Sequence, residues 1–389
     1  MNKIPNHEPS INVPKTINLL RKCLNSNWIS ASGKFVKEFE NNISEYTKAK
    51  YVIACNSGTS ALQVALRIAG VEKNDEVIAP TLTFVATINS IIYNQASPIF
   101  MDCDNYFNLD IEKTIEFLNQ KTTLKNGYCV NKLTKKKIKA ILPVYVWGNT
   151  LNLKKLKKIA DKKNIKIIED ASEALGTFTH YGKTKRHAGL EGLAGCLSFN
   201  ANKIITTGGG GAIITNSLKF AKKALYLTTQ AKSSSIEFIH NEIGYNSRLT
   251  SLPAVLGITQ LKEISKKIKN KKKNYEYYRK KINGLRYFKI AEVPNNSLNN
   301  HWMNILKINS NKSLSRAFLL KYLNKKGINA RPVWRLNHNQ KPFKSYEKYK
   351  ISRAKYLYNT SICLPSGPSL SKKDINYIYE ILYKLEKKQ

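Results

Sequence analysis

Long apolar runs, paired cysteines and acidic residues are all scarce in this chain of 389 residues. No run approaches the roughly 20 consecutive apolar residues of a membrane-spanning helix, so we expect no membrane partner. The first residues lack the apolar core of a signal peptide, which favours a cytoplasmic protein. Neither the six cysteines nor the histidines have the spacing of a zinc site or a redox pair. We therefore expect no metal.

The scarcity of acidic residues leaves a strongly basic chain. Against 65 lysines and arginines stand 26 acidic residues, a formal charge of +39. The excess is mostly lysine spread over nearly every predicted helix, whereas nucleic-acid-binding surfaces concentrate arginine and expose aromatic residues. A solvated basic surface is the preferred interpretation, with no nucleic-acid partner, and a nucleic-acid-binding protein is the alternative. Such a surface would still attract a phosphorylated or nucleotide-linked substrate.

Apolar strands and amphipathic helices alternate through the first part of the chain. This alternation predicts an α/β fold, a mostly parallel sheet covered on both faces by helices. Residues 120–138 are lysine-rich and predict an excursion or hairpin. The predicted strands are 51–55, 76–80, 98–102, 140–146, 166–169, 195–199 and 212–215, and the predicted helices include 60–70 and about 84–94.

The pattern changes after about residue 253. A long helix is predicted at 253–281, followed by two short strands near 286–291 and 302–308. Two more helices are expected at 313–326 and 371–387. The chain is therefore predicted to have a large α/β domain at 1–252 and a smaller α+β domain at 253–389.

Lys203 ends the segment Ser-Phe-Asn-Ala-Asn-Lys at 198–203, after a predicted strand and before four glycines at 208–211. A lysine amine condenses with an aldehyde to give a Schiff base, the attachment used by pyridoxal phosphate enzymes. The glycines precede a strand instead of joining a strand to a helix, so they do not form a dinucleotide-binding motif. Most lysines here are surface charges, and Lys203 needs supporting residues.

Asp170 supplies the first support, because it follows a predicted strand. The carboxyl ends of parallel strands form the crevice where α/β sheets bind ligands. A carboxylate there can keep a pyridine nitrogen protonated, which makes the ring an electron sink. Capping of the next turn is the alternative role for Asp170.

The segment Asn-Ser-Gly-Thr-Ser at 56–60 joins a predicted strand to a helix. Its amides and hydroxyls suit a phosphate at a helix N-terminus, and an ordinary helix cap is the alternative. Ser198 offers another hydroxyl. Phe84 opens the next helix and could stack on a planar ring, although core packing is the default for a single phenylalanine.

Taken together, the chain resembles the DegT/StrS family of sugar aminotransferases, pyridoxal phosphate enzymes of fold type I. Within that family it is most similar to aminotransferases of legionaminic acid and bacillosamine synthesis, through 227–232, 239–246 and the 120–138 insertion. The family likeness lies in 27–30, 56–62, 75–83, 168–171, 198–211, 244–248 and 330–334, and in His338.

The resemblance implies that Lys203 attaches the cofactor and carries protons. Asp170 would pair with the pyridine nitrogen, and Glu173 would lie near the phenolic oxygen. Asn246 would reach the phosphate of the neighbouring subunit's cofactor, which implies a homodimer with shared sites. The remaining implied contacts are Gly58, Thr59 and Ser198 for the phosphate, Phe84 for the ring, and Trp28, Ser30, Arg248 and His338 for the substrate.

The implied reaction moves an amino group from glutamate to the 4-keto carbon of a nucleotide-linked, UDP-type 4-keto-6-deoxy-N-acetylhexosamine, for cell-surface glycans. Perosamine-type chemistry on a GDP- or dTDP-linked keto sugar is the alternative. A non-catalytic protein that binds pyridoxal phosphate or a sugar nucleotide is a further one. Related dehydratases replace the anchoring lysine with histidine, so Lys203 favours amino transfer.

Overall fold

The computed structural model describes residues 3–234, 236–309 and 314–388. Its largest sheet has eight strands in the order β1-β11-β10-β7-β6-β2-β3-β16. Strand β11 is antiparallel to both of its neighbours, and every other pairing is parallel, so the predicted mostly parallel sheet is confirmed. The strands are β1 (Tyr51–Cys55), β2 (Glu76–Pro80), β3 (Ser97–Met101), β6 (Ile138–Ile141), β7 (Lys166–Asp170), β10 (Ala194–Ser198), β11 (Gly211–Thr215) and β16 (Lys348–Tyr349).

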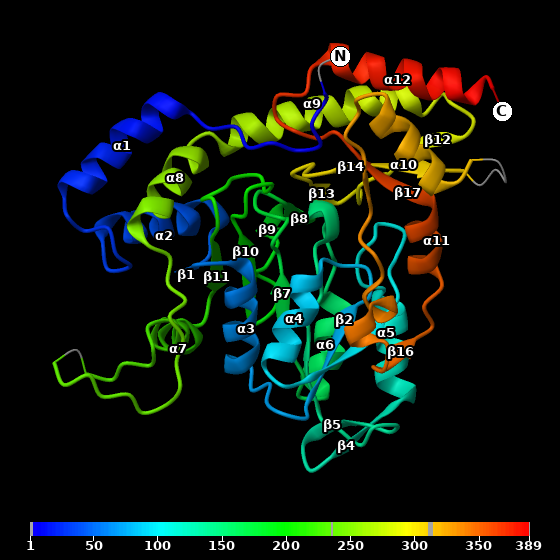
Figure 1. Ribbon diagram of the computed structural model, residues 1–389. Helices are drawn as coiled ribbons and strands as arrows, with labels where there is room; N and C mark the ends of the chain where they lie inside the picture. Colours follow the sequence, from blue (N-terminus) through cyan, green and yellow to red (C-terminus); the bar gives the residue numbers. More distant parts are fainter. Residues whose placement is uncertain (1–2, 235, 310–313, 389) are drawn as a thin grey trace.

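Helices cover both faces of this sheet (Figure 1). Successive strand residues point to opposite faces. In β1, Ile53 and Cys55 belong to one core and Ala54 to the other. The first core is closed by α3 (Gly58–Ile68), α4 (Val85–Tyr93) and α7 (Leu218–Thr228), the second by α2 (Lys34–Thr47), α5 (Ile111–Gln120), α6 (Lys154–Lys162) and α8 (Ser251–Leu261).

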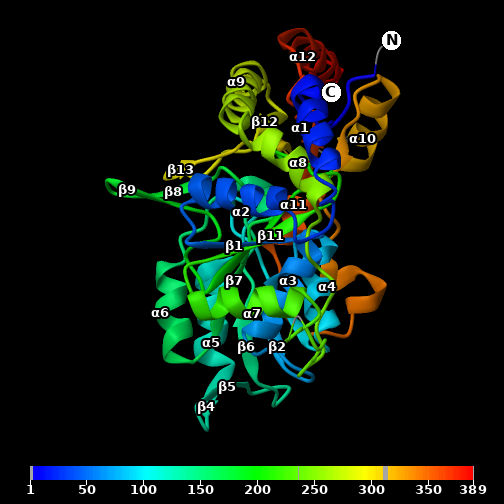
Figure 2. The same cartoon turned by 90° about the vertical axis from the view of Figure 1, so that its left-hand side faces the viewer.

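A second, antiparallel sheet of four strands has the order β12-β14-β17-β15 and its own core. Both views place α9, α10 and α12 together at this end of the molecule, where both termini also lie (Figures 1 and 2). Residue 313, where a helix was expected to begin, lies outside the described residues. The elements are β12 (Phe288–Ile290), β14 (Asn304–Ile308), β15 (Arg331–Pro332), β17 (Ser361–Leu364), α9 (Ile264–Ile282), α10 (Arg316–Lys325), α11 (Arg353–Thr360) and α12 (Lys372–Glu386).

The remaining elements are short. Among the described residues, no helix is long and apolar enough to cross a bilayer, and no group of histidine, cysteine or acidic side chains could hold a metal ion. The predicted hairpin within 120–138 is confirmed, as β4 (Thr122–Lys125) and β5 (Tyr128–Asn131). A three-stranded sheet contains β8 (Phe178–Tyr181), β9 (Thr184–His187) and β13 (Ser297–Leu298), and the 3-10 turns are Val146–Gly148, Asn337–Asn339 and Lys341–Phe343.

Two predicted elements differ from the structure. The single helix expected at 253–281 is divided into α8 and α9, because the backbone turns at Glu263 (φ −106°, ψ 2°). This turn lets α8 pack in the large core while α9 exposes most of its lysines, with Lys267 and Lys271 buried. The strand expected at 140–146 ends at Ile141, shortly before Pro143, whose ring removes a backbone N–H from the ladder.

The chain passes between the two sheets more than once. Strand β16 pairs with β3 at the edge of the large sheet, although it lies late in the sequence. Ile4 forms a parallel bridge with Ile328, and helix α1 (Val13–Asn25) lies against α8. The predicted domain boundary between residues 252 and 253 stays a prediction.

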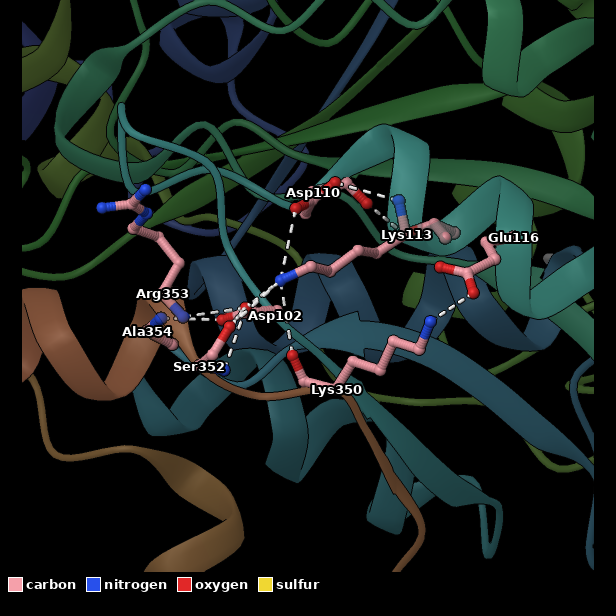
Figure 3. A network of polar contacts seen from close by, with 9 residues as sticks. Asp102, Asp110, Lys113, Glu116, Lys350, Ser352, Arg353 and Ala354 are labelled. Atoms are coloured by element: carbon pink, nitrogen blue, oxygen red, sulfur yellow. Dashed lines mark hydrogen bonds and ion pairs between the residues drawn. The ribbon is translucent and has the colours of Figure 1, made fainter.

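A buried carboxylate also joins the two parts. Asp102, directly after β3, accepts hydrogen bonds from the backbone N–H groups of Ser352, Arg353 and Ala354 at 2.7–3.0 Å, at the start of α11 (Figure 3). The Lys113 ammonium lies 2.5 Å from the same carboxylate. Burial alone would raise the pKa of Asp102, but these hydrogen bonds outweigh it and hold that pKa below its ordinary value.

Candidate active site

A cavity of about 580 Å³ opens at the carboxyl edge of the large sheet. Strand ends and the helix starts that follow them surround it, as expected for a ligand crevice in a parallel sheet. Every residue predicted to bind the cofactor lines this cavity except Asn246. They are Gly58, Thr59, Phe84, Asp170, Glu173, Ser198 and Lys203.

Lys203 projects into the cavity with its side chain only 11% exposed. Its Nζ lies 3.4 Å from Glu173 Oε1 and 4.2 Å from the centre of the Trp302 ring. An ammonium over an indole face is attracted by the ring quadrupole. Trp302 also holds the lysine segment, because its Nε1 donates a hydrogen bond of 2.6 Å to the carbonyl of Asn202.

Glu173 lies beneath this lysine and is buried. Burial raises the pKa of Glu173 to about 7, against the opposing effects of the Lys203 charge and of the Trp147 N–H, which donates to Oε2 at 2.9 Å. Trp147 has a left-handed backbone (φ 59°), a strained conformation for a residue other than glycine. The strained turn therefore aims a backbone donor at Glu173.

Asp170 ends β7 and is almost fully buried. Its Oδ2 accepts a hydrogen bond of 2.7 Å from the Thr87 hydroxyl on α4, and its Oδ1 accepts one of 3.1 Å from the Ser172 N–H. A carboxylate has about four acceptor sites, so these two bonds leave capacity for a further donor. The turn-capping role and a ligand-binding role are thus compatible in Asp170.

The N-terminus of α3 forms another wall. Ser57 caps the helix by accepting a hydrogen bond of 3.0 Å from the Ser60 N–H, which leaves Gly58 and Thr59 at the cavity. A Cβ at Gly58 would lie 2.9 Å from Ser198 Cβ. Glycine therefore allows α3 and β10 to approach closely, and the first turn of α3 presents its amides to an anion.

This arrangement fits pyridoxal phosphate. Amides and hydroxyls at the start of α3 suit the phosphate, and the Asp170 carboxylate suits the pyridine nitrogen. The Lys203 amine is in reach of an aldehyde within the same cavity. Phe84, which is 48% exposed, offers a ring face at the rim, next to Trp334 at a centroid distance of 6.0 Å.

Arg248 and His338 lie outside the lining of the cavity. The Arg248 guanidinium pairs with Glu40 at 2.8 Å and donates to the carbonyl of Ala54 at 3.0 Å. His338 Nδ1 lies 2.6 Å from the Thr81 hydroxyl, and burial lowers the pKa of His338 to about 4. Both side chains thus have partners within the chain, and their predicted substrate contacts stay predictions.

Trp28, Ser30 and Asn246 also lie away from the cavity lining. Trp28 is 60% exposed, and Ser30 follows it in the connection between α1 and α2. Asn246 is exposed in the long segment between α7 and α8, where its carbonyl accepts a hydrogen bond from Asn56 Nδ2. Their predicted contacts with substrate or with a neighbouring subunit stay predictions.

Three tryptophans lie in the site, and the sequence analysis gave none of them a role there, although Trp334 falls in the 330–334 stretch that carries the family likeness. Trp147 and Trp334 stack with centroids 4.1 Å apart, and Trp302 lies 5.9 Å from Trp147. Trp147 follows a strand that ends at the same sheet edge, a position that pointed to the site. Trp302 and Trp334 come from the second half of the chain, where no local pattern indicates the contact.

Comparison with known proteins agrees with this geometry. The sequence pattern of the DegT/DnrJ/EryC1/StrS aminotransferase family matches residues 11–383. The chain is 33% identical to the GDP-perosamine synthase of Escherichia coli O157:H7 over 98% of both chains. It is 30% identical to EpsN of Bacillus subtilis, a putative pyridoxal phosphate-dependent aminotransferase, over 94% of this chain and 92% of that one.

A solved structure shows the same fold. Helicobacter pylori PseC, an aminotransferase involved in the biosynthesis of pseudoaminic acid, superposes with a TM-score of 0.88 at 23% identity and full coverage of both chains. The fold-type expectation is thereby confirmed. With the family pattern covering nearly the whole chain, the protein belongs to the DegT/DnrJ/EryC1/StrS aminotransferase family and is a pyridoxal phosphate-dependent aminotransferase.

Proposed function

We propose that the protein moves an amino group from glutamate to the 4-keto carbon of a nucleotide-linked 4-keto-6-deoxyhexose. The observation that carries this proposal is the placement of Lys203 and Asp170 in one cavity with the start of α3. An amine, a carboxylate and a phosphate-binding helix end form the set of groups that this chemistry requires.

Pyridoxal phosphate, when bound, supplies an electron sink for the carbanion formed at the reacting carbon. Asp170, which accepts a hydrogen bond from Thr87, would hold the ring nitrogen in its protonated form. Lys203 Nζ would serve as the general acid–base of the reaction, accepting and donating protons as a single amine. Glu173 holds that amine in place at 3.4 Å, and Trp302 covers it on one side.

Two kinds of acceptor sugar are supported by different observations. The resemblance to legionaminic acid and bacillosamine enzymes favours a UDP-linked N-acetylhexosamine. The 33% identity to a GDP-perosamine synthase over nearly the full length favours a GDP-linked sugar without the acetamido group. Both acceptors are 4-keto-6-deoxy sugars that would receive the amine at C4, so the proposed reaction is the same for both.

A substrate panel tests the proposal. Purified protein is incubated with pyridoxal phosphate, glutamate and UDP-, GDP- or dTDP-linked 4-keto-6-deoxy sugars, and products are identified by mass spectrometry and NMR. We expect one nucleotide series to gain an amine at C4, with 2-oxoglutarate formed in equal amount. If every acceptor is recovered unchanged while glutamate still bleaches the visible absorption of the enzyme, the acceptor assignment is wrong.

We further propose a homodimer in which Asn246 completes the partner's site. The segment between α7 and α8 extends away from the rest of the molecule (Figure 1), and it carries Ile236 and Ile243 at 86% and 81% exposure. Exposed apolar side chains on an extended segment are typical of an interface. Cytoplasmic localisation also stays a proposal, which cell fractionation would test.

Subunit mixing tests the shared site. Lys203→Ala and Asn246→Ala proteins, each of low activity, are unfolded together and refolded. If Asn246 acts across the interface, each mixed dimer contains one intact site, and about one quarter of the wild-type activity returns at equal mixing. Absence of any recovery, with mixed dimers shown by native mass spectrometry, would contradict the shared site.

A further inference from the structure

Gln260 is a buried side chain of α8 that contacts the loop carrying Lys203. It is 2% exposed. Its Nε2 donates a hydrogen bond of 2.6 Å to the carbonyl of Thr206, and its Oε1 lies 3.4 Å from the Thr206 N–H. The side-chain amide of Gln260 thus binds both the N–H and the carbonyl group of Thr206.

Thr206 closes the loop 199–208, which carries Lys203 and is called the lysine loop here. Its hydroxyl donates to the carbonyl of Phe199 at 3.1 Å and accepts from the Gly208 N–H at 2.9 Å. The Thr207 N–H donates to the same Phe199 carbonyl at 2.9 Å. Phe199 precedes Lys203 and Thr206 follows it, so these bonds close the segment from which Lys203 projects.

The Gln260 side chain is itself oriented by a buried cation, the Lys267 ammonium. Lys267 Nζ, on α9, donates 2.7 Å hydrogen bonds to Gln260 Oε1 and to the carbonyl of Ser10. Because the ammonium donates to Oε1, the amide must point its Nε2 toward Thr206. Lys267 is only 7% exposed, and a charge that has lost its water depends strongly on such partners. The amide orientation is therefore determined by Lys267, a residue that is not among those lining the cavity.

We propose that Gln260, oriented by Lys267, is a positioning residue for Lys203. By fixing the Thr206 backbone, it holds the loop 199–208 so that the lysine amine stays in place opposite Glu173 and Trp302. Gln260 is not among the residues lining the cavity, so it would act on Lys203 through the Thr206 backbone. The inference rests on the proposed role of Lys203 in amino transfer.

The test compares two Gln260 variants with a matched control. Gln260→Met keeps the length of the side chain and removes both polar ends. Gln260→Glu keeps an acceptor for Lys267 and removes the donor to Thr206. The control, Thr259→Val, changes the neighbouring buried residue, whose hydroxyl lies 3.0 Å from the Thr16 hydroxyl of α1 and donates to the carbonyl of Leu256 at 3.0 Å.

Hydrogen–deuterium exchange of the cofactor-free proteins measures how well the backbone amides of the lysine loop are protected. We expect amides in 199–208 to exchange about tenfold faster in both Gln260 variants, as loss of one or two ordinary hydrogen bonds implies, and at the wild-type rate in Thr259→Val. In the loaded enzymes, kcat for the glutamate half-reaction should fall by a similar factor in the Gln260 variants with KM for glutamate unchanged. Thr259→Val should keep the wild-type kcat.

Unchanged exchange in 199–208 would overturn the inference, as would an equal loss of kcat in Thr259→Val. If Gln260→Met does not fold, Gln260→Glu decides, because its carboxylate can pair with Lys267. Failure of the proposed function shows separately, as a wild-type enzyme that does not react with glutamate. The exchange measurement does not depend on that reaction.

Discussion

The Thr87 hydroxyl donates a 2.7 Å hydrogen bond to Asp170 Oδ2, and the Thr83 hydroxyl lies 2.9 Å from that of Thr87. The carboxylate assigned to the cofactor ring is thus oriented from α4. We expect Thr87→Val to lower kcat by about 10- to 100-fold, because a hydrogen bond to a charged, buried group is lost. Stopped-flow absorbance of the glutamate half-reaction measures this effect.

Thr87→Ser keeps the hydroxyl and should retain most of the activity. Ser90→Ala removes a different buried hydroxyl of the same helix, which donates to the Thr87 carbonyl, and it should leave kcat near the wild-type value. A Thr87→Val enzyme with wild-type kcat would show that Asp170 needs no support from α4.

Lys203→Ala should be colourless after gel filtration with pyridoxal phosphate, because no amine remains to form the imine. Its kcat should fall by about 10³-fold or more, as expected when a general base is removed. Absorbance spectra and product formation give the two readouts. Lys155→Ala, at a lysine side chain that is 74% exposed, is the control and should match the wild type. Full turnover in Lys203→Ala would refute the role of this lysine.

Gly58→Ala should weaken cofactor binding. The new methyl group would lie 2.9 Å from Ser198 Cβ, so α3 must move away from β10 and its amides from the phosphate. Overpacking of this kind costs about 1–3 kcal/mol, which corresponds to roughly tenfold or more in the dissociation constant of pyridoxal phosphate. Fluorescence titration measures it.

The double variant Gly58→Ala/Ser198→Gly isolates the steric part of this effect. Removing the Ser198 side chain makes room for the methyl group, so affinity should recover relative to Gly58→Ala unless the hydroxyl is itself a strong phosphate donor. Ser198→Gly alone separates these two contributions, as in a double-mutant cycle. Equal cofactor affinity in Gly58→Ala and wild type would show that the close approach is unnecessary.

Asp102→Asn should lower the free energy of unfolding by about 3 kcal/mol at pH 7, because one member of a buried ion pair is lost. Since the pKa of Asp102 is held below its ordinary value, its contribution is present above the unfolded-state pKa of about 3.9 and is lost as pH falls through the folded-state pKa. The gap between wild type and variant should therefore shrink below about pH 4.

Urea unfolding from pH 7 to pH 3 measures this gap. Glu112→Gln removes a partner from an exposed pair, since the Glu112 side chain is 70% exposed, and should change stability little at any pH. A gap of the same size at pH 3 and pH 7 would show that the Asp102 charge is not the cause.

The sequence predicted the part of the site that depends on strand ends. Asp170 and Ser198 end neighbouring parallel strands, and Gly58 follows shortly after the end of β1, so sheet geometry alone brings them together. Lys203 follows Ser198 by a short loop. These positions could be assigned because each depends on a local pattern and on one general rule of sheet topology.

The contacts that support the site could not be predicted from such rules. Gln260 and Trp302 reach the lysine loop from distant parts of the chain, and only tertiary packing determines those contacts. The left-handed backbone of Trp147 has no sequence signal, because asparagine or glycine is the usual residue in that conformation. The break in the long predicted helix at Glu263 likewise depends on tertiary packing, because α8 and α9 pack in different cores.

Strand β16 has a consequence for biosynthesis. Residues 348–349 pair with β3 and leave it with a neighbour on each side. During translation β16 emerges from the ribosome only after nearly the whole polypeptide has been made, so until then β3 is an unpaired edge strand. Unpaired edge strands on nascent chains attract other strands. A chaperone that shields this edge of β3 on ribosome-bound chains would therefore raise the yield of native protein.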